Sequence, residues 1–189
     1  MEEGKIVYFE SGGKHNTEKT LEIVKERLRK GDIKKVVLAS VTGYSAEKAL
    51  TILKDTNAEI IVVGVRGLGP GFPAELKQRL KESGHKVIFA EDVTINFPEV
   101  VKETLWRFCE GMKVCVEIVL IATDAGLLQP GEEVIAVAGT GPLGYEKGGG
   151  VDTAIVMEAI RSGDFLQLET IYGMKEKRRK IKEILCKPR

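Results

Sequence analysis

The chain of 189 residues has few aromatic side chains and no excess of positive charge, the two features on which nucleic-acid-binding surfaces depend. Aromatic residues make up only 6% of the chain, which leaves few rings on which nucleotide bases could stack. The 29 basic residues are balanced by 28 acidic ones, so the net charge is only +1. A chain without a basic excess is not drawn to nucleic acid or to an anionic membrane. We therefore expect neither partner.

Cysteine is also scarce. The three cysteines, Cys109, Cys115 and Cys186, lack the paired spacing of a zinc site. Their odd number argues equally against a disulfide framework. We expect three free, reduced thiols and no metal centre.

Long hydrophobic runs are absent. The longest apolar stretch, residues 114–128, contains Glu117 and Asp124 and is shorter than the roughly 20 residues that a membrane-spanning helix needs. The first five residues are acidic and lack the apolar stretch of a signal peptide. Both observations predict a cytoplasmic protein.

No catalytic constellation stands out in the sequence. His15 and His85 lie far apart, and neither belongs to a Ser-His-Asp or Cys-His pattern. His15 falls in a turn where it could touch a ligand, although a plain surface histidine is the simpler interpretation. Glu117 and Asp124 share one helix face, where carboxylates are more often structural than catalytic. We therefore assign no catalytic residue.

What the chain does have is a regular alternation of short apolar runs and helical stripes. Residues 60–63 form a run with no polar face, which is typical of a strand covered by helices on both sides. The alternation predicts an α/β fold with three α/β/α layers around a mainly parallel sheet. No linker or repeat divides the chain, so one domain is expected over residues 1–189. The expected strands are residues 6–9, 36–39, 60–63, 87–90, 134–138 and about 153–157.

Two segments depart from strict alternation. Residues 98–125 predict two successive helices in place of one. Near the C-terminus, Ile181, Ile184 and Leu185 recur at helical spacing among Lys, Arg and Glu, which predicts a basic terminal helix at about residues 174–187. We interpret it as a solvated helix with one docking stripe, and a basic binding tail is the alternative.

Ligands of open parallel sheets bind beyond the carboxyl ends of the strands, so the turns after the strands are the expected site. Several of these turns combine glycine with Ser, Thr or Asn. Glycine lets the backbone approach a ligand, hydroxyl groups donate hydrogen bonds, and the next helix presents its positive end. These are the needs of a phosphate group. The turns are residues 11–16, 40–45, 66–72, 91–96 and 139–152.

The turn at residues 40–46 meets these needs best, because it leads directly from a strand into a helix. Thr42 and Ser45 can donate to a phosphate oxygen, as can the N–H groups from Gly43 onward. The alternative is purely structural, with Ser45 capping the helix and Gly43 making the turn.

Two other turns carry candidate ligand contacts. Arg66 could supply positive charge to a phosphate, unless it is simply a surface arginine. The loop at residues 139–150 is long and glycine-rich, which favours a lid or ligand-binding flap over an idle surface loop. Its spaced glycines resemble a dinucleotide fingerprint, but Pro142 and further glycines stand where a helix should begin, so we do not assign that role.

The turn at residues 40–46 also resembles the Thr-Lys-Thr-Gly-Arg-Ser-Ala turn in the C-terminal α/β domain of pyruvate kinase. Residues 58–66 are similar to a Pro-Ile-Ile-Ala-Val-Thr-Arg strand of that domain. Residues 131–138 and 148–153 are similar to its Gly-Asp-Val-Val strand and to the end of its glycine loop. The resemblance implies the fold of that domain. It implies no pyruvate kinase activity, because the catalytic barrel has no counterpart here.

The whole chain is also similar to a small group of stand-alone archaeal proteins of this fold. That resemblance implies a flavin mononucleotide (FMN) ligand at the loop end of the sheet and no particular reaction. In pyruvate kinases the matching turn helps to bind the phosphate of a sugar-phosphate effector. Val41 and Tyr44 stand where that turn has Lys and Arg, so two charges are missing, and Tyr44 instead offers a flat ring for the isoalloxazine. The candidate FMN-binding residues are Ser11, Gly12, Asn16, Ser40, Thr42, Gly43, Tyr44, Ser45, Arg66, Gly67, Gly139, Thr140, Gly141, Asp152 and Thr153.

The preferred hypothesis is an FMN-binding protein and, if it is an enzyme, a flavin-dependent oxidoreductase. A non-catalytic regulatory module that binds a sugar phosphate or a nucleotide is the first alternative. An oligomerisation module that uses the apolar helix at residues 112–125 is the second. A homo-oligomer is compatible with each of them.

Overall fold

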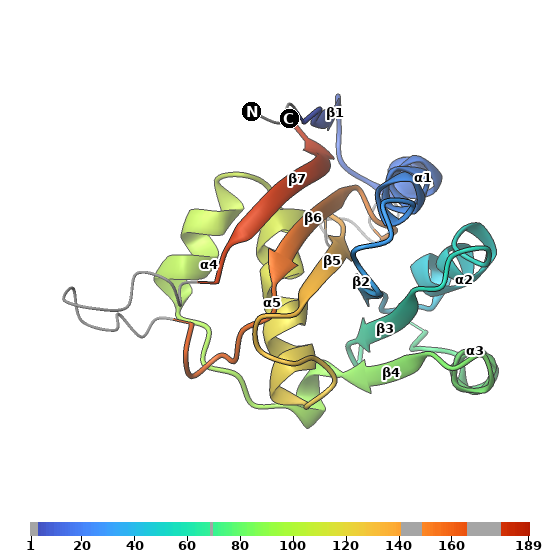
Figure 1. Cartoon of the computed structure of the whole chain (residues 1–189). Helices are drawn as coiled ribbons and strands as arrows, with labels where there is room; N and C mark the ends of the chain where they lie inside the picture. Colours follow the sequence, from blue (N-terminus) through green and yellow to red (C-terminus); the bar gives the residue numbers. More distant parts are fainter. Residues whose placement is uncertain (1–3, 69, 141–148, 166–178) are drawn as a thin grey trace.

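The computed structural model describes residues 4–68, 70–140, 149–165 and 179–189. These residues form one seven-stranded sheet with helices on both faces (Figure 1), so the predicted α/β class is confirmed. The strands are β1 (Val7–Phe9), β2 (Lys35–Ala39), β3 (Glu59–Gly64), β4 (Lys86–Phe89), β5 (Glu133–Ala138), β6 (Thr153–Glu158) and β7 (Ile181–Pro188). Across the sheet they follow the order β1-β7-β6-β5-β2-β3-β4.

Side-chain alternation along the strands explains why both faces are covered. The helices are α1 (Thr17–Leu28), α2 (Tyr44–Ile52), α3 (Ala74–Glu82), α4 (Glu99–Trp106) and α5 (Glu110–Asp124). Val36 and Leu38 of β2 pack into a first core with α1, α2 and α3, whereas Val37 between them packs into a second core with α5. Because a strand that is apolar on both faces must be shielded on both, the sheet lies between these helices.

The sheet is mixed, whereas the sequence predicted a mainly parallel one. β6 runs antiparallel to β5 and β7, and the other pairings are parallel. The reason lies at the base of the loop between β5 and β6. A side chain on Gly139 would collide with the backbone of Gly150, so the two ends of the loop touch. Ala138 then pairs directly with Thr153, and the chain returns beside β5 in the opposite direction.

The C-terminal segment is a strand, so the terminal helix predicted at about residues 174–187 is wrong where the structure describes it. β7 lies between β1 and β6 and pairs with both. Leu185 and Cys186 are buried there. Helical spacing of a few apolar residues is a local signal, and strand pairing on two sides outweighs it. Residues 174–178 of that prediction lie outside the described residues.

α5 is the central helix of the second core. Most of its apolar residues, from Met112 to Ala122, pack against β2, β5 and β6 and are almost completely buried. The helix that the sequence suggested as an oligomerisation surface is therefore covered within the chain itself. That alternative is wrong, and an oligomer would have to use another surface.

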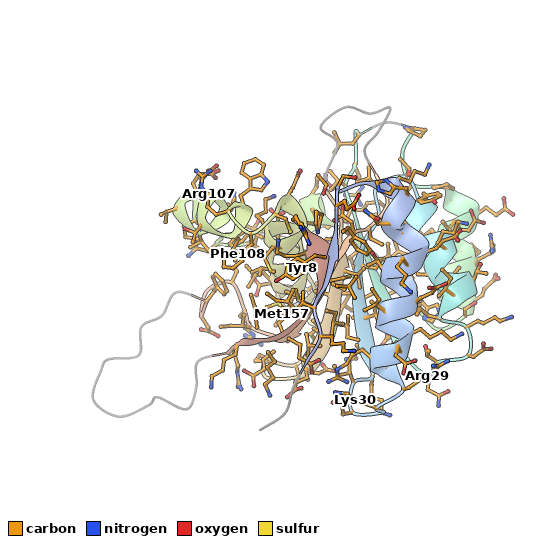
Figure 2. All side chains as sticks on the ribbon, turned by 90° about the horizontal axis from the view of Figure 1, so that it is seen from above. Tyr8, Arg29, Lys30, Arg107, Phe108 and Met157 are labelled. Carbon is orange, nitrogen blue, oxygen red and sulfur yellow. The ribbon has the colours of Figure 1, made fainter. Side chains whose placement is uncertain are left out.

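The edge formed by β1 and β7 is joined to the end of α4 by Lys187. Its ammonium lies 5.4 Å from the ring centroid of Tyr8. It also donates a hydrogen bond to the carbonyl oxygen of Phe108, 3.1 Å away. Figure 2 shows Tyr8 on β1 and Phe108 just beyond α4. Tyr8 is 50% and Phe108 52% exposed, so this edge presents aromatic surface to solvent.

Arg27 of α1 holds β7 against the first core. Its buried guanidinium donates to both carboxylate oxygens of Asp32 and of Glu183, with N–O distances between 2.7 and 3.0 Å. Donating these hydrogen bonds to the two carboxylates raises the pKa of Arg27, and accepting them lowers the pKa of Asp32 to about 2. One side chain thus connects the end of α1, the following turn and the last strand.

Replacing Arg27 by Met should lower the free energy of unfolding by about 2 kcal/mol, because hydrogen bonds to charged groups contribute about 1.5–3 kcal/mol and both carboxylates are partly exposed. Arg29→Met is the matched control. The side chain of Arg29 is 67% exposed at the same end of α1 (Figure 2), so its loss should cost less than about 0.5 kcal/mol. Chemical denaturation followed by circular dichroism measures both. Equal losses would show that Arg27 does not hold β7.

His85 is positioned by the way α3 ends. Gly84 adopts a left-handed conformation with φ 81°. The N–H groups of Gly84 and His85 then donate to the carbonyl oxygens of Lys81 and Leu80, which is a Schellman motif. The motif places the imidazole beside β3, where Nδ1 accepts a hydrogen bond from the N–H of Ile60 at 3.2 Å. Burial lowers the pKa of His85 because the charged ring would be poorly solvated.

The protein should therefore lose stability on acidification through His85. Well above pH 6.5, the ordinary pKa of histidine, the ring is neutral in the folded and the unfolded chain. Below that value the unfolded chain binds the proton more strongly, so the free energy of unfolding falls as the pH drops through the lowered pKa of the folded state. In His85→Asn, whose Oδ1 can accept the same N–H without titrating, this slope below pH 6.5 should disappear. Urea unfolding at a series of pH values tests this, and identical slopes in the two proteins would contradict it.

Candidate functional site

Every strand except β6 ends at the same edge of the sheet, and β6 begins there. We call this edge, with its connecting segments, the loop edge. The residues that the sequence singled out lie here in two main groups. One surrounds Asp152, just before β6, and the other forms the turn into α2. A third, smaller group follows β3.

Asp152 is completely buried and holds three segments together. Its Oδ2 accepts hydrogen bonds from the N–H of Gly13 at 2.7 Å, the N–H of Thr140 at 3.1 Å and the hydroxyl of Thr140 at 2.7 Å. Its Oδ1 accepts from the hydroxyl of Thr153 at 2.9 Å. The turn after β1, the segment after β5 and the start of β6 therefore meet at one carboxylate.

Glycine is required where these segments approach one another. A side chain on Gly12 would collide with the hydroxyl of Thr140 and come within 3.1 Å of Asp152 Oδ2. A side chain on Gly111, in the first turn of α5, would collide with Thr153. The glycine after β1 that the sequence assigned to a ligand thus serves close packing around Asp152.

The turn after β2 leads directly into α2, as the sequence predicted, but Gly43 and not Ser45 stands at the N-cap. Gly43 stands at the N-cap in a left-handed conformation with φ 87°, and a side chain there would press on Pro73 and Leu76. Ser40 Oγ accepts the N–H of Ala46 at 3.3 Å, so Ser40 serves the helix start. The other two predicted donors of this turn differ in solvent exposure. Thr42 is exposed, whereas Ser45 is almost wholly buried.

Lys14 is the residue of this site that sequence patterns did not reveal. It follows β1, far from α2 in sequence, yet its ammonium lies 4.0 Å from the ring centroid of Tyr44, the first residue of α2. A cation is thereby held beside the positive end of a helix. The signal in the sequence was a lysine directly after Gly12 and Gly13, in a turn already identified as ligand-facing.

Arg66 is engaged elsewhere. Its guanidinium makes two hydrogen bonds to the carboxylate of Asp92, each of 2.6 Å, and lies 4.2 Å from the ring centroid of Phe89. The backbone N–H of Arg66 donates to the Glu91 carboxylate at 2.9 Å. The hydrogen bonds between Arg66 and Asp92 raise the pKa of Arg66 and lower that of Asp92. Arg66 therefore ties the turn after β3 to the segment after β4, and its positive charge is already compensated.

The other predicted contacts are placed as follows. Asn16 occupies the N-cap position of α1 but caps nothing with its side chain, and its amide instead donates to the carbonyl oxygen of Ser11 at 2.8 Å. Ser11 Oγ lies 3.5 Å from the imidazole of His15. Gly67, with φ 74°, makes the exposed turn beside Arg66. Gly141 and the rest of the predicted flap, residues 141–148, lie outside the described residues.

All three cysteines are free thiols, and two of them are strongly shielded. Burial raises the pKa of Cys115 well above its ordinary value and that of Cys186 to about 12. Cys109 is half-buried, with its Sγ 3.5 Å from the hydroxyl of Thr153. Cys115 and Cys186 are therefore protonated and unreactive at neutral pH.

Metal-binding clusters and membrane-spanning helices are both absent from the described residues. Within them, no cluster of three or more His, Cys, Asp or Glu side chains could hold a metal ion. No helix in the described part of the chain is long and apolar enough to cross a bilayer.

Comparison with known proteins gives a weak structural similarity. No protein-family model matches the chain. Among solved structures it is similar to a pyruvate kinase from Cryptosporidium parvum, with 16% sequence identity and a TM-score of 0.39. The match covers 76% of this chain but only 23% of that one, so the chain spans less than a quarter of that enzyme. Similarity at this level assigns no function, so a function has to be inferred from the residues of the loop edge.

Removing the Asp152 carboxylate should loosen the loop edge. Asp152→Ala leaves at least the buried N–H of Gly13 and the partly buried N–H of Thr140 without an acceptor, at about 1–3 kcal/mol each, so we expect a loss of about 2–6 kcal/mol in the free energy of unfolding. Asp152→Asn keeps one acceptor oxygen and should lose less than half as much. Urea denaturation gives both values, and amide hydrogen exchange at Gly13 and Thr140 localises the effect. An alanine variant as stable as the wild type would disprove the role of Asp152.

Proposed function

We propose that this protein binds a small phosphate-bearing ligand, FMN in the first instance, with the phosphate at the start of α2. The single observation that carries the proposal is the position of the Lys14 ammonium, 4.0 Å from the ring centroid of Tyr44 at the first residue of that helix. Phosphates bind where helix N–H groups and a cation converge. Here the two converge at a turn that ends a buried strand.

The start of α2 has donors to offer. The N–H of Ala46 is taken by Ser40 Oγ, and the N–H of Glu47 by the carbonyl oxygen of Gly43. Among the described residues this leaves the N–H groups of Tyr44 and Ser45 for a ligand. Gly43 at the N-cap has no side chain that could occupy the position. The exposed hydroxyl of Thr42 adds a side-chain donor beside them.

Lys14 supplies the charge that this turn lacks in its own sequence. Val41 and Tyr44 replace the two basic residues of the pyruvate kinase turn, which left the proposed phosphate without a cation. An ammonium over the face of Tyr44 is stabilised by the ring and stays beside the helix start. The cation therefore comes from a different segment, the turn after β1.

FMN fits this arrangement through its phosphate, and its ring is more constrained. One face of Tyr44 is covered by Lys14, so the isoalloxazine would stack on the opposite face or take the place of the ammonium. FMN, when bound, would supply redox chemistry. The residues described here would bind and orient it, namely Lys14, Thr42 and Tyr44 with the N–H groups that follow.

The same contact favours a second candidate. A non-catalytic module that binds a sugar phosphate or a nucleotide needs the phosphate contacts but no free aromatic face. Lys14 over Tyr44 satisfies that need as it stands. The two candidates differ in whether the group attached to the phosphate is a flavin.

Replacing Lys14 by Gln should weaken FMN binding about ten- to hundredfold, because a hydrogen bond to a charged phosphate contributes about 1.5–3 kcal/mol. Lys14→Gln combined with Thr42→Ala should weaken it further. Quenching of flavin fluorescence measures the dissociation constants. Lys19→Gln is the matched control, since Lys19 is an exposed lysine of α1 that pairs with Glu22.

Riboflavin, which lacks the phosphate, separates the phosphate contact from general damage. Its weaker binding should not change in Lys14→Gln, whereas a distorted site would lose both ligands. Wild-type protein that binds riboflavin as well as FMN would refute a phosphate site. Displacement of FMN by ribose 5-phosphate at similar concentrations would favour the sugar-phosphate module over the flavoprotein.

A further inference from the structure

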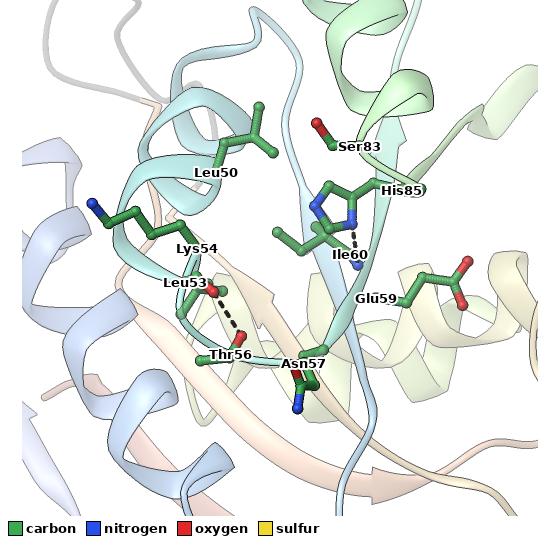
Figure 3. Close-up of a pocket in the computed structure, with 11 residues that line it drawn as sticks. Leu50, Leu53, Lys54, Thr56, Asn57, Glu59, Ile60, Ser83 and His85 are labelled. Carbon is green, nitrogen blue, oxygen red and sulfur yellow. Dashed lines mark hydrogen bonds between the residues drawn. The ribbon is translucent and has the colours of Figure 1, made fainter.

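A pocket lies at the opposite edge of the sheet from the loop edge. It is formed where α2 ends, β3 begins and α3 ends, and it has a volume of about 480 Å³. Figure 3 shows the residues that line it. The volume falls in the range of small-molecule sites, about 300–1,000 Å³. β3 separates this pocket from the turn that carries Arg66, so the two regions are distinct.

The pocket has an apolar wall. Leu50 and Leu53 contribute it from α2 and Ile60 from β3 (Figure 3). Leu53 and Ile60 are almost fully buried, whereas Leu50 is only partly covered. An apolar wall of this size suits a compact hydrocarbon or aromatic group.

Three backbone acceptors at the helix ends beside the pocket are already engaged. The carbonyl oxygen of Leu53, at the end of α2, accepts from the N–H of Thr56 at 2.9 Å and from its hydroxyl at 2.7 Å. The carbonyl oxygens of Leu80 and Lys81, at the end of α3, accept from His85 and Gly84. Helix ends usually attract cations through free carbonyl groups, and here that attraction is largely used up.

Two side-chain hydrogen-bond donors at the pocket, from His85 and Lys54, are still available to a ligand. Because His85 Nδ1 accepts the N–H of Ile60, the proton of the neutral ring is on Nε2. In Figure 3 this second ring nitrogen faces the α2 side of the pocket. Lys54, at the end of α2, has no hydrogen bond or ion pair with any described residue. The carboxylate of Glu59 points away from His85 in the same view.

We propose that this pocket binds a small organic acid, with its carboxylate on His85 Nε2–H and Lys54 and its apolar body against Leu53 and Ile60. The lining also includes the side chains of Asn57, Glu59 and Ser83, and the Glu59 carboxylate points away from His85. His85 Nε2–H and the Lys54 ammonium are the two donors that would receive an acceptor group. In Figure 3 the Lys54 ammonium extends away from His85, and its exposed, flexible stem lets it swing over a carboxylate bound in the pocket. The proposal is independent of the phosphate site, because it uses none of the same residues.

Benzoate is a suitable probe, and the two histidines of the chain provide the readout. Long-range proton–nitrogen spectra at neutral pH should show His85 in the Nε2–H form. Titration with millimolar benzoate should shift the His85 Nε2 signal saturably and leave His15 unmoved. Benzamide, which has the same ring without the charge, should bind at least about tenfold more weakly.

Variants decide between this pocket and loose surface binding. Lys54→Gln should weaken benzoate about tenfold, whereas Lys19→Gln, a remote exposed lysine, should leave it unchanged. FMN binding should be unaltered in Lys54→Gln, which keeps failure of this site distinguishable from failure of the phosphate site. The proposal is overturned if benzoate leaves His85 unmoved, if both histidines shift alike, if benzamide binds equally well, or if Lys54→Gln binds benzoate like the wild type.

Discussion

The buried carboxylate of Asp152 is the constraint on which the loop edge depends. Among the described residues its partners are N–H and O–H donors of Gly13, Thr140 and Thr153 rather than a cation. A buried anion without its hydrogen bonds is several kcal/mol less stable, so these donors must stay together. The turn after β1 is thereby fixed to the β5–β6 connection. That connection in turn sets β6 antiparallel, which allows β7 and then β1 to extend the sheet.

The sequence predicted the elements whose causes are local. The apolar run of β3 and the two successive helices before β5 were read from patterns within a few residues, and both are present. The direction of β6 depends on contact between Gly139 and Gly150, and the strand β7 depends on β1, β6 and Arg27. Such causes lie far apart along the chain. Periodicity at residues 181–185 fits a helix as well as a strand, and only the partner strands decide between them.

The candidate site likewise has features that depend on contiguous residues and features that depend on distant ones. The turn into α2 was predictable because Ser40, Gly43 and the helix start are contiguous. The contact between Lys14 and Tyr44 was not, because it joins two separate segments. The sequence also suggested Arg66 as a cation for the phosphate, but its guanidinium is paired with Asp92. Charge in a turn is therefore a weak guide to ligand binding unless the partners of that charge are known.

Asp152 also decides which glycine-rich turn can receive a phosphate. The turn after β1 has the glycines and helix start that an anion site needs, but the N–H of Gly13 already donates to Asp152. The Asp152 carboxylate therefore already occupies the anion position of that turn. A phosphate bound there would be repelled by this buried negative charge. The turn into α2 holds no such carboxylate among its described contacts. The Lys14 side chain extends to Tyr44, so its positive charge lies at the turn into α2, which has no such carboxylate among the described residues.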